Sequence, residues 1–258
     1  MSIRLILLSL CTIALLEADE EFNTGQNIVK PLTRLDLRMK YETGVDVQNG
    51  NAAIATLRMD KVISLPLSWE LSFRVDLPYW WYRCTTHSTN GCYNSQVMGD
   101  TLLQILAVTP AHGPWIWGFG AKLLFPTAGD NLEVGDGKYQ VLPTIAFGYD
   151  IFAWGAGSFC GLLVRHAFDV AGFASAPHIN RTYIQPTLNI VLPNEWFITY
   201  SPEMCYNWEV SGWFIPFDLT LGKMVTKECV VTLEYEVALM RQYKQYRQLI
   251  EFRVGYFF

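Results

Sequence analysis

The last twelve residues read Arg247-Gln-Leu-Ile-Glu-Phe-Arg-Val-Gly-Tyr-Phe-Phe258, and apolar and polar side chains alternate along them. Alternate positions from Gln248 to Phe258 form a mostly apolar set, and the intervening positions carry Glu251 and Arg253. A repeat of two residues indicates a β-strand with two unlike faces. In a soluble sheet the charged face would meet water outside, whereas in a membrane barrel the apolar face meets lipid and the charged face meets a wet lumen.

Residues 1–18 have the layout of a secretory signal peptide. Arg4 supplies the positive start, Leu5 to Leu16 form an apolar core, and Ala18 is a small residue at a suitable cleavage point. The apolar core is shorter than the roughly 20 residues that a membrane-spanning helix needs. We therefore expect an exported chain with a single mature domain over residues 19–258.

The composition is apolar for a soluble protein. Hydrophobic residues make up 51% of the chain, charged residues 17% and aromatic residues 14%. Many aromatic residues without long apolar runs are typical of membrane barrels, whose interfaces carry aromatic girdles. A secreted soluble β-sandwich is the alternative. The net charge of −5 provides no basic surface, so we expect no nucleic-acid partner.

Segments with period-two alternation recur along the chain and predict about twelve strands. They cover residues 33–43, 52–64, 67–81, 98–108, 115–125, 139–149, 153–166, 180–192, 196–208, 213–223, 230–241 and 247–258. An even number of strands is typical of single-chain bacterial barrels. Most connections after the first, third, fifth and seventh strands are longer than those after the even-numbered strands. We therefore predict an all-β, transmembrane, antiparallel up-and-down β-barrel with short turns and both termini in the periplasm.

Two of the predicted strands carry aromatic residues at both ends of an apolar face. One has Trp69 at one end and Tyr79 and Trp81 at the other, and the second is bracketed by Trp196 and Trp208. Aromatic residues gather at membrane–water interfaces. We expect Trp69 and Trp196 at the periplasmic interface and the other three at the outer one.

The polar faces of the predicted strands would line the barrel lumen with charged side chains. This set comprises Arg34, Asp36, Arg38, Lys40, Glu70, Arg74, Asp76, Lys122, Glu234, Glu236, Glu251 and Arg253. Closure brings the first strand beside the last, so we expect Arg34 and Arg38 to meet Glu251. By the same argument, Glu234 and Glu236 should meet Arg253. Such charges either form a salt-bridge ladder that fills the lumen or a polar constriction that selects solutes.

Removal of the signal peptide would leave five of the six cysteines, an odd number in an oxidising compartment. Cys84 and Cys92 bracket a polar stretch with a turn-forming Asn-Gly pair, on one predicted external loop. We predict a disulfide between them that holds the loop over the pore mouth. Cys160, Cys205 and Cys229 fall on separate strands, where burial as small apolar residues suits them.

Motifs of soluble enzymes and metal centres are missing from the sequence. No Gly-x-Ser-x-Gly elbow occurs, and no two of the four histidines have the spacing of a metal site. We therefore expect no catalytic residue, no bound metal and no cofactor. His166 is either a polar residue at a strand end or a rim base of the kind that outer-membrane phospholipases use.

Short motifs follow one another in order from Trp115 to the end of the chain. They are Gly118-x-Gly120, Pro126-Thr-Ala128, Gly135-x-Gly137-Lys-Tyr-Gln140-x-x-Pro143, Pro193-Asn-Glu-Trp-Phe-Ile-Thr199, Ser201-Pro202, Pro216 and Gly222-Lys223. Together with the final strand, they resemble the outer-membrane family labelled "MetA-pathway of phenol degradation". The resemblance covers somewhat more than half of the chain. It implies a porin-like barrel that transports small, often aromatic or otherwise hydrophobic, molecules.

The final strand also resembles the closing strand of bacterial outer-membrane barrels, where it serves as an assembly signal. The resemblance implies that the barrel-assembly machinery recognises Phe258. We thus expect a protein of the bacterial outer membrane, surrounded by its lipid, that passes or binds small-molecule solutes. A structural or surface-interaction barrel without transport is one alternative, and a lipid-acting barrel enzyme is another.

Overall fold

The computed structural model describes residues 23–45, 50–84, 96–129, 134–243 and 245–258. These residues form one closed β-barrel, with three short 3-10 helices in its turns: η1 (Pro66–Ser68), η2 (Phe152–Trp154) and η3 (Pro193–Glu195). No helix among the described residues is long and apolar enough to cross a membrane.

Twelve strand positions make up the barrel wall, and two of them are each built from two shorter strands. The strands are β1 (Arg34–Val45), β2 (Gly50–Ser64), β3 (Glu70–Cys84), β4 (Val97–Met98), β5 (Thr101–Val108), β6 (Trp115–Phe125), β7 (Lys138–Asp150), β8 (Phe159–Gly172), β9 (Asn180–Val191), β10 (Trp196–Tyr200), β11 (Met204–Asn207), β12 (Gly212–Met224), β13 (Cys229–Arg241) and β14 (Gln248–Phe257). Strands β4 and β5 both pair with β3, and β10 and β11 both lie between β9 and β12. The predicted count of twelve is confirmed.

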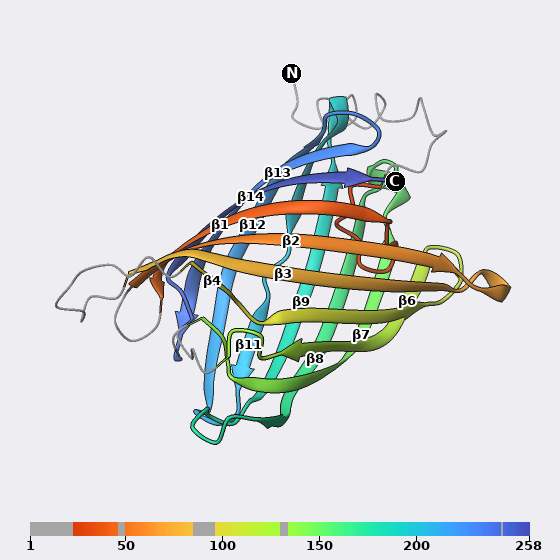
Figure 1. Ribbon diagram of the computed structural model, residues 1–258. Helices are drawn as coiled ribbons and strands as arrows, with labels where there is room; N and C mark the ends of the chain where they lie inside the picture. The colour runs from red at the N-terminus through yellow and green to blue at the C-terminus, as the bar shows by residue number, and fades with distance from the viewer. Residues whose placement is uncertain (1–22, 46–49, 85–95, 130–133, 244) are drawn as a thin grey trace.

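The barrel closes where the first strand pairs with the last. Arg34 lies opposite Phe257, and Thr43 lies opposite Gln248, in an antiparallel ladder. Every neighbour in the wall is antiparallel, and consecutive strand positions are adjacent, which gives the up-and-down order (Figure 1). Closure pairs the backbone polar groups that an open sheet edge would leave exposed to lipid.

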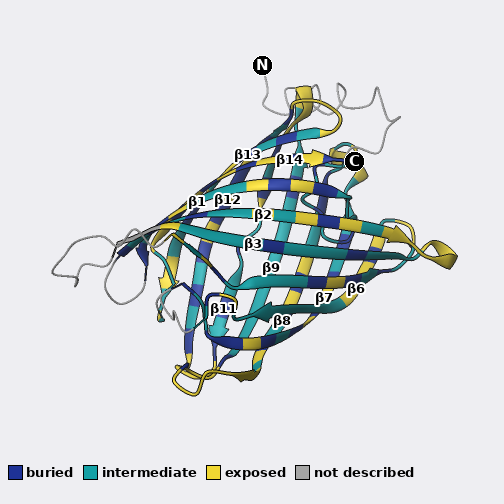
Figure 2. Cartoon of the chain, viewed as in Figure 1, coloured by how far each residue is buried: buried dark blue, intermediate teal, exposed yellow. Residues whose placement is uncertain are grey.

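Side chains alternate between the outer surface and the lumen along the strands. In β14, Ile250 is 48% exposed and Phe252 45%, whereas the intervening Glu251 is 9% and Arg253 1% exposed. The predicted two-faced closing strand is confirmed, and exposed and buried residues likewise alternate on other strands (Figure 2). The outward set is aliphatic and aromatic, so the barrel presents an apolar belt that suits a lipid environment.

Two turns share a sequence pattern, and both lie at the end of the barrel where β1 begins and β14 ends. Leu65-Pro-Leu-Ser-Trp69 and Leu192-Pro-Asn-Glu-Trp196 each close with the Leu N–H donating to the Trp carbonyl, at 2.8 and 2.7 Å. The two central residues of each turn have φ between 58° and 63°. Turns with two positive φ values match the right-handed twist of the flanking strands. The two turns follow the second and the eighth strand positions, and such even-numbered connections lie at one end of an up-and-down barrel. Trp69 and Trp196 therefore lie at the same end.

Four predicted strands are wrong in their boundaries. The strand placed at 67–81 is β3 (Glu70–Cys84), because η1 occupies the residues before it, and the strand placed at 98–108 is divided into β4 and β5 at residues 99–100. The strand placed at 153–166 is β8 (Phe159–Gly172), because η2 and Gly155, with φ of 99°, turn the chain before it. The loop placed at 167–179 is correspondingly shorter. The strand placed at 196–208 is interrupted at residues 201–203, where Pro202 offers no N–H to the ladder.

Candidate functional site

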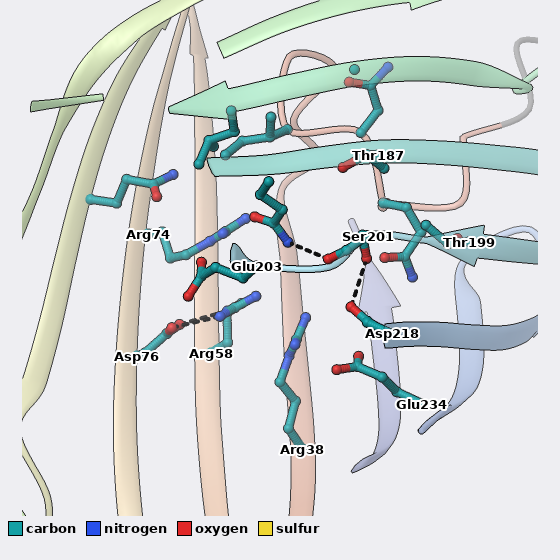
Figure 3. A pocket seen from close by; sticks show the side chains of 18 of the residues that line it. Arg38, Arg58, Arg74, Asp76, Thr187, Thr199, Ser201, Glu203, Asp218 and Glu234 are labelled. Atoms are coloured by element: carbon teal, nitrogen blue, oxygen red, sulfur yellow. Dashed lines mark hydrogen bonds and ion pairs between the residues drawn. The ribbon is translucent and has the colours of Figure 1, made fainter. Parts of the chain in front are cut away.

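The barrel lumen contains a cavity of about 530 Å³, a volume within the range of small-molecule sites. Side chains from strands all around the barrel line it, and most of them are charged or polar. Figure 3 shows Arg58 and Arg74 on one side and Asp218 and Glu234 on the other, with Arg38 between them. The cavity is therefore a polar space whose walls differ in charge.

One wall is a network of arginines and aspartates on β1, β2 and β3. Arg58 donates to both carboxylate oxygens of Asp76 at 2.7 Å. Asp60 accepts from Arg34 at 2.6 Å and from Arg74 at 2.7 Å. Charge-assisted bonds of this kind fix the planar guanidinium groups in one orientation. Because burial of the ions costs desolvation energy, the network serves the shape of the wall more than net stability.

The arginine network continues across the closing seam between β1 and β14. Arg38 donates to Glu251 at 2.9 Å, as the closure argument predicts. Arg34 does not reach Glu251, because its guanidinium turns to Asp60 on β2. The predicted pairing of the first strand with the last is thus correct for one arginine of the two.

The predicted contact of Glu234 and Glu236 with Arg253 is wrong. The register places Arg253 opposite Thr232 on β13, and places Glu234 opposite Glu251. Arg253 instead donates to Asp36 of β1 at 3.1 Å, with both side chains almost fully buried. The acidic residues of β13 are left facing other carboxylates.

Charged groups without an oppositely charged partner line the cavity. In the described part of the chain, Asp218, Glu234 and Glu236 form no ion pair, although they lie close together on β12 and β13. Lys122 on β6 lines the same cavity and has no hydrogen-bond or ion-pair partner among the described residues. Nearby Arg165 of β8 pairs with Glu203, at 3.1 Å, in the break between β10 and β11. The lumen therefore holds uncompensated positive and negative groups.

An N-terminal segment, residues 23–32, lies inside the barrel before β1 begins (Figure 1). Val29 is 1% exposed and packs in an apolar cluster with Leu106, Ile116 and Leu163, which are inward-facing residues of the wall. Lys30 forms an ion pair with Asp150 at 2.9 Å. The segment is held in the lumen by packing and by this ion pair.

The N-terminal segment separates two spaces. Lys30, Pro31 and Leu32 line the charged cavity, and they also line a second cavity of about 350 Å³ beside the turn residues Ser68 and Pro110. The second cavity lies at the end of the barrel where β1 begins and β14 ends. The segment therefore stands between the charged cavity and that end of the lumen.

Most side chains of the predicted lumen set face the charged cavity. Its lining includes Arg34, Arg38, Lys40, Arg74, Asp76, Lys122, Glu234, Glu236 and Glu251. Asp36 and Arg253 are buried behind it, and Glu70 lines the second cavity. The predicted disulfide lies outside the described residues, because the side chain of Cys84 and residues 85–95 are not described. Phe258 is 79% exposed and stacks edge-on against Tyr256.

Seven charged residues that line the cavity are missing from the sequence-based set: Lys30, Glu42, Arg58, Asp60, Arg165, Glu203 and Asp218. Arg58 and Asp218 alternate with apolar neighbours, so a polar-face signal was present in β2 and β12. Arg165 lies on a strand whose boundaries were misplaced. Glu203 lies in an irregular break, where no periodicity indicates which way a side chain points.

The outer surface carries one polar contact that bears on the enzymatic alternative. His166 lies between inward-facing Arg165 and Ala167, so its ring points outward. Its Nδ1 is 3.0 Å from Oγ1 of Thr182, and Trp208 donates its indole N–H to the same oxygen at 2.9 Å. No carboxylate or amide side chain among the described residues contacts the ring to orient it. The contact is a hydroxyl–imidazole pair without the third group of a catalytic triad.

Comparison of the fold identifies bacterial outer-membrane barrels as its structural relatives. The COG4313 outer membrane channel from Pseudomonas putida F1 has a TM-score of 0.73 at 13% identity, with 94% of this chain and 99% of that chain covered. The NanC porin has a TM-score of 0.58 at 12% identity, with 87% and 98% covered. Outer membrane phospholipase A from Escherichia coli has a TM-score of 0.54 at 11% identity, with 96% and 97% covered.

No protein-family model matches the sequence, and no curated protein matches it in sequence. The resemblance to the phenol-degradation family therefore stays an expectation. At these identities the structural likeness concerns the fold, which is that of outer-membrane channels and porins. A closed barrel with an apolar outer belt spans a membrane, and this architecture places the chain in the bacterial outer membrane.

Proposed function

We propose that the protein is an outer-membrane channel for small organic molecules that carry charged groups. The observation that supports this most directly is the cavity of about 530 Å³ in the lumen, whose walls hold uncompensated charges of both signs. A filled lumen would have its charges paired throughout. Here Lys122 of β6 lines the same cavity as Asp218, Glu234 and Glu236 of β12 and β13.

The lining narrows the class of solute. A purely hydrophobic molecule would displace water from guanidinium and carboxylate groups without replacing their hydrogen bonds, which is costly. A zwitterion or an organic anion can instead bond to the fixed arginines, whose fork geometry matches carboxylates. The aromatic substrates implied by the family resemblance fit this lumen when the ring carries a charged group, as in benzoate.

The proposed orientation follows from the loops. Short turns at the end that holds the termini suit the periplasmic side, and the longer connections suit the external side. The N-terminal segment then blocks the lumen from the periplasm, and its displacement opens the passage. The outward Phe258 at the end of β14 suits recognition by the barrel-assembly machinery.

Solute uptake by proteoliposomes tests the proposal. Vesicles containing purified protein should admit glycine and benzoate faster than uncharged solutes of matched size, such as acetamide and benzyl alcohol, after correction for leakage through protein-free vesicles. Uptake that follows hydrophobicity alone would contradict the proposed solute class. Vesicles that admit no solute, even with residues 23–30 deleted, would favour a structural or surface-interaction barrel.

A matched pair of variants separates the lumen from the outer surface. Lys122→Gln removes one positive charge from the cavity wall, whereas Lys61→Gln removes one from an exposed position on β2. We expect Lys122→Gln to slow benzoate uptake severalfold and Lys61→Gln to leave it unchanged. Equal effects of the two variants would show that the cavity charge does not select solutes.

A second candidate is a lipid-acting enzyme, and the contact of His166 with Thr182 on the outer surface is the observation that favours it. We rank it second because no carboxylate or amide side chain among the described residues orients the imidazole. Release of fatty acid from phospholipid by purified protein, abolished by Thr182→Val, would promote this candidate above the channel.

A further inference from the structure

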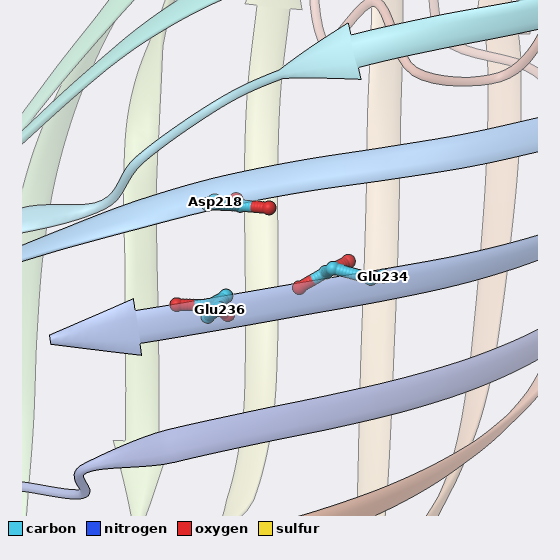
Figure 4. A group of neighbouring side chains, drawn as sticks. All are labelled: Asp218, Glu234 and Glu236. Atoms are coloured by element: carbon cyan, nitrogen blue, oxygen red, sulfur yellow. The ribbon is translucent and has the colours of Figure 1, made fainter.

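Three carboxylates meet on the wall of the cavity without a cation. Asp218 of β12 lies beside Glu234 and Glu236 of β13, and one oxygen of each lies within 4.8 Å of the others (Figure 4). The nearest basic residues of β1 are engaged elsewhere: Arg38 pairs with Glu251, and Lys40 pairs with Glu42. The group therefore carries three formal negative charges with no ion-pair partner among the described residues, and its hydrogen-bond donors are the neutral hydroxyls of Ser201, Thr220 and Tyr246.

The strand register makes this arrangement costly by itself. Asp218 lies directly opposite Glu236, and Glu234 lies directly opposite Glu251 on the next strand. Like charges at directly opposed positions repel each other. In a closed barrel the strands cannot slip to separate them, because a shift in register at one pair disturbs the pairing of the neighbouring strands.

An independent observation shows that the group is short of a partner. Asp218 is 4% exposed, and its Oδ1 is buried with no hydrogen-bond donor. Its other oxygen, Oδ2, accepts from the Ser201 hydroxyl at 3.2 Å. Buried carboxylate oxygens without a donor are rare because desolvation is then uncompensated. An orphaned oxygen in a group of three carboxylates is what a missing cation would leave.

We propose that Asp218, Glu234 and Glu236 bind a calcium ion on the lumen wall. Calcium accepts oxygen ligands at 2.3–2.6 Å in flexible geometry, so two of its ligands can lie up to about 5 Å apart. The three oxygens lie within 4.8 Å of one another, inside this span. Magnesium demands near-ideal octahedral geometry at about 2.0–2.1 Å, whereas calcium accepts the irregular geometry that side chains on two neighbouring strands offer. Hydrated space in the adjacent cavity can supply water ligands.

Bound calcium would change the wall that solutes meet. Two positive charges would offset most of the three negative ones, and the ion would join β12 to β13 near the Ser201 break. The site goes beyond the proposed channel function, because it does not require that any solute crosses the barrel. Ion binding is measured on purified protein, so a failure of this inference is distinguishable from a failure of transport.

Titration calorimetry of the full chain tests the proposal. Protein folded in detergent is stripped with a chelator, dialysed and titrated with calcium chloride alone, and then with magnesium chloride. We expect one calcium site per barrel, calcium binding tighter than magnesium, and at least a tenfold loss of affinity in the Asp218→Asn, Glu236→Gln double variant. Glu195→Gln, an exposed carboxylate in the η3 turn, is the matched control and should bind calcium normally.

A single-ligand variant and a folding assay distinguish the loss of calcium binding from misfolding. Glu234→Gln alone changes one ligand, and heat-modifiable gel mobility shows whether each variant forms a barrel. Calcium should also raise the thermal unfolding midpoint of the unaltered protein and of Glu195→Gln, but not that of a folded ligand variant. Saturable binding that survives in folded ligand variants, tighter binding of magnesium, or no calcium binding to the unaltered protein would each overturn the assignment.

Discussion

A substitution in the barrel wall should displace the N-terminal segment from the lumen. Gly148 faces inward on β7, and a Cβ atom at this position would lie 2.4 Å from Cγ2 of Val29. Carbon atoms pack at about 3.5–4.0 Å, so the two side chains cannot coexist. Gly148→Leu should therefore expel Val29 from its cluster without altering any residue of the segment.

The expected size of the effect follows from the burial of Val29. This side chain is 1% exposed, and Val29→Ala removes two methyl groups, worth about 1.6 kcal/mol at about 0.8 kcal/mol each. Since 1.4 kcal/mol is a factor of ten, the displaced population should rise roughly tenfold to twentyfold. Gly148→Leu removes the whole contact and should raise it at least as much.

Labelling of a single cysteine measures this population. Gln26→Cys in a background without other cysteines places the probe in the segment, and a bulky maleimide reacts with it only when the segment leaves the lumen. The reaction rate should rise in the order unaltered, Val29→Ala, Gly148→Leu. The double variant should match Gly148→Leu alone, because the contact can be lost only once. Unchanged rates in both single variants would refute the view that Val29 anchors the segment.

Three further outcomes are expected. Deletion of Phe258 should leave unassembled protein in the periplasm, and a normal heat-modifiable barrel would count against its role as an assembly signal. Asp60→Ala removes the carboxylate that accepts from buried Arg34 and from Arg74, so the free energy of unfolding should fall by about 3–5 kcal/mol. A loss below about 1 kcal/mol in a urea titration of the folded barrel would show that the network is dispensable. Peptide mapping without reductant should recover Cys84 joined to Cys92, and free thiols at both positions would disprove the disulfide.

Local pattern was sufficient to predict the architecture. Strict alternation in the closing strand, with Phe252 outside and Arg253 inside, follows from the two-residue repeat and requires no knowledge of neighbours. The number of strands follows in the same way, because each crossing of the membrane repeats the pattern. Where the pattern is interrupted, as at Gly155 and Pro202, the strand ends were misplaced or missed.

The sequence alone was a poorer guide to which charged side chains pair with each other in the lumen. Arg253 pairs with Asp36 and not with Glu234, because a register difference of a few residues between β13 and β14 decides which charges meet. The N-terminal segment shows no periodicity, since it packs through Val29 and a few neighbours instead of forming a strand. Its place in the lumen depends on small residues such as Gly148 in strands more than a hundred residues away.

Single-channel recording in planar lipid bilayers tests most directly whether the lumen is a passage. Purified Gly148→Leu protein should give discrete current steps that are longer-lived or larger than those of the unaltered protein, since the segment between the two cavities is displaced. Lys122→Gln in the same background should shift the reversal potential in a salt gradient toward greater cation preference. Bilayers that show no steps with Gly148→Leu, nor with residues 23–30 deleted, although both proteins are folded and inserted, would contradict the channel account.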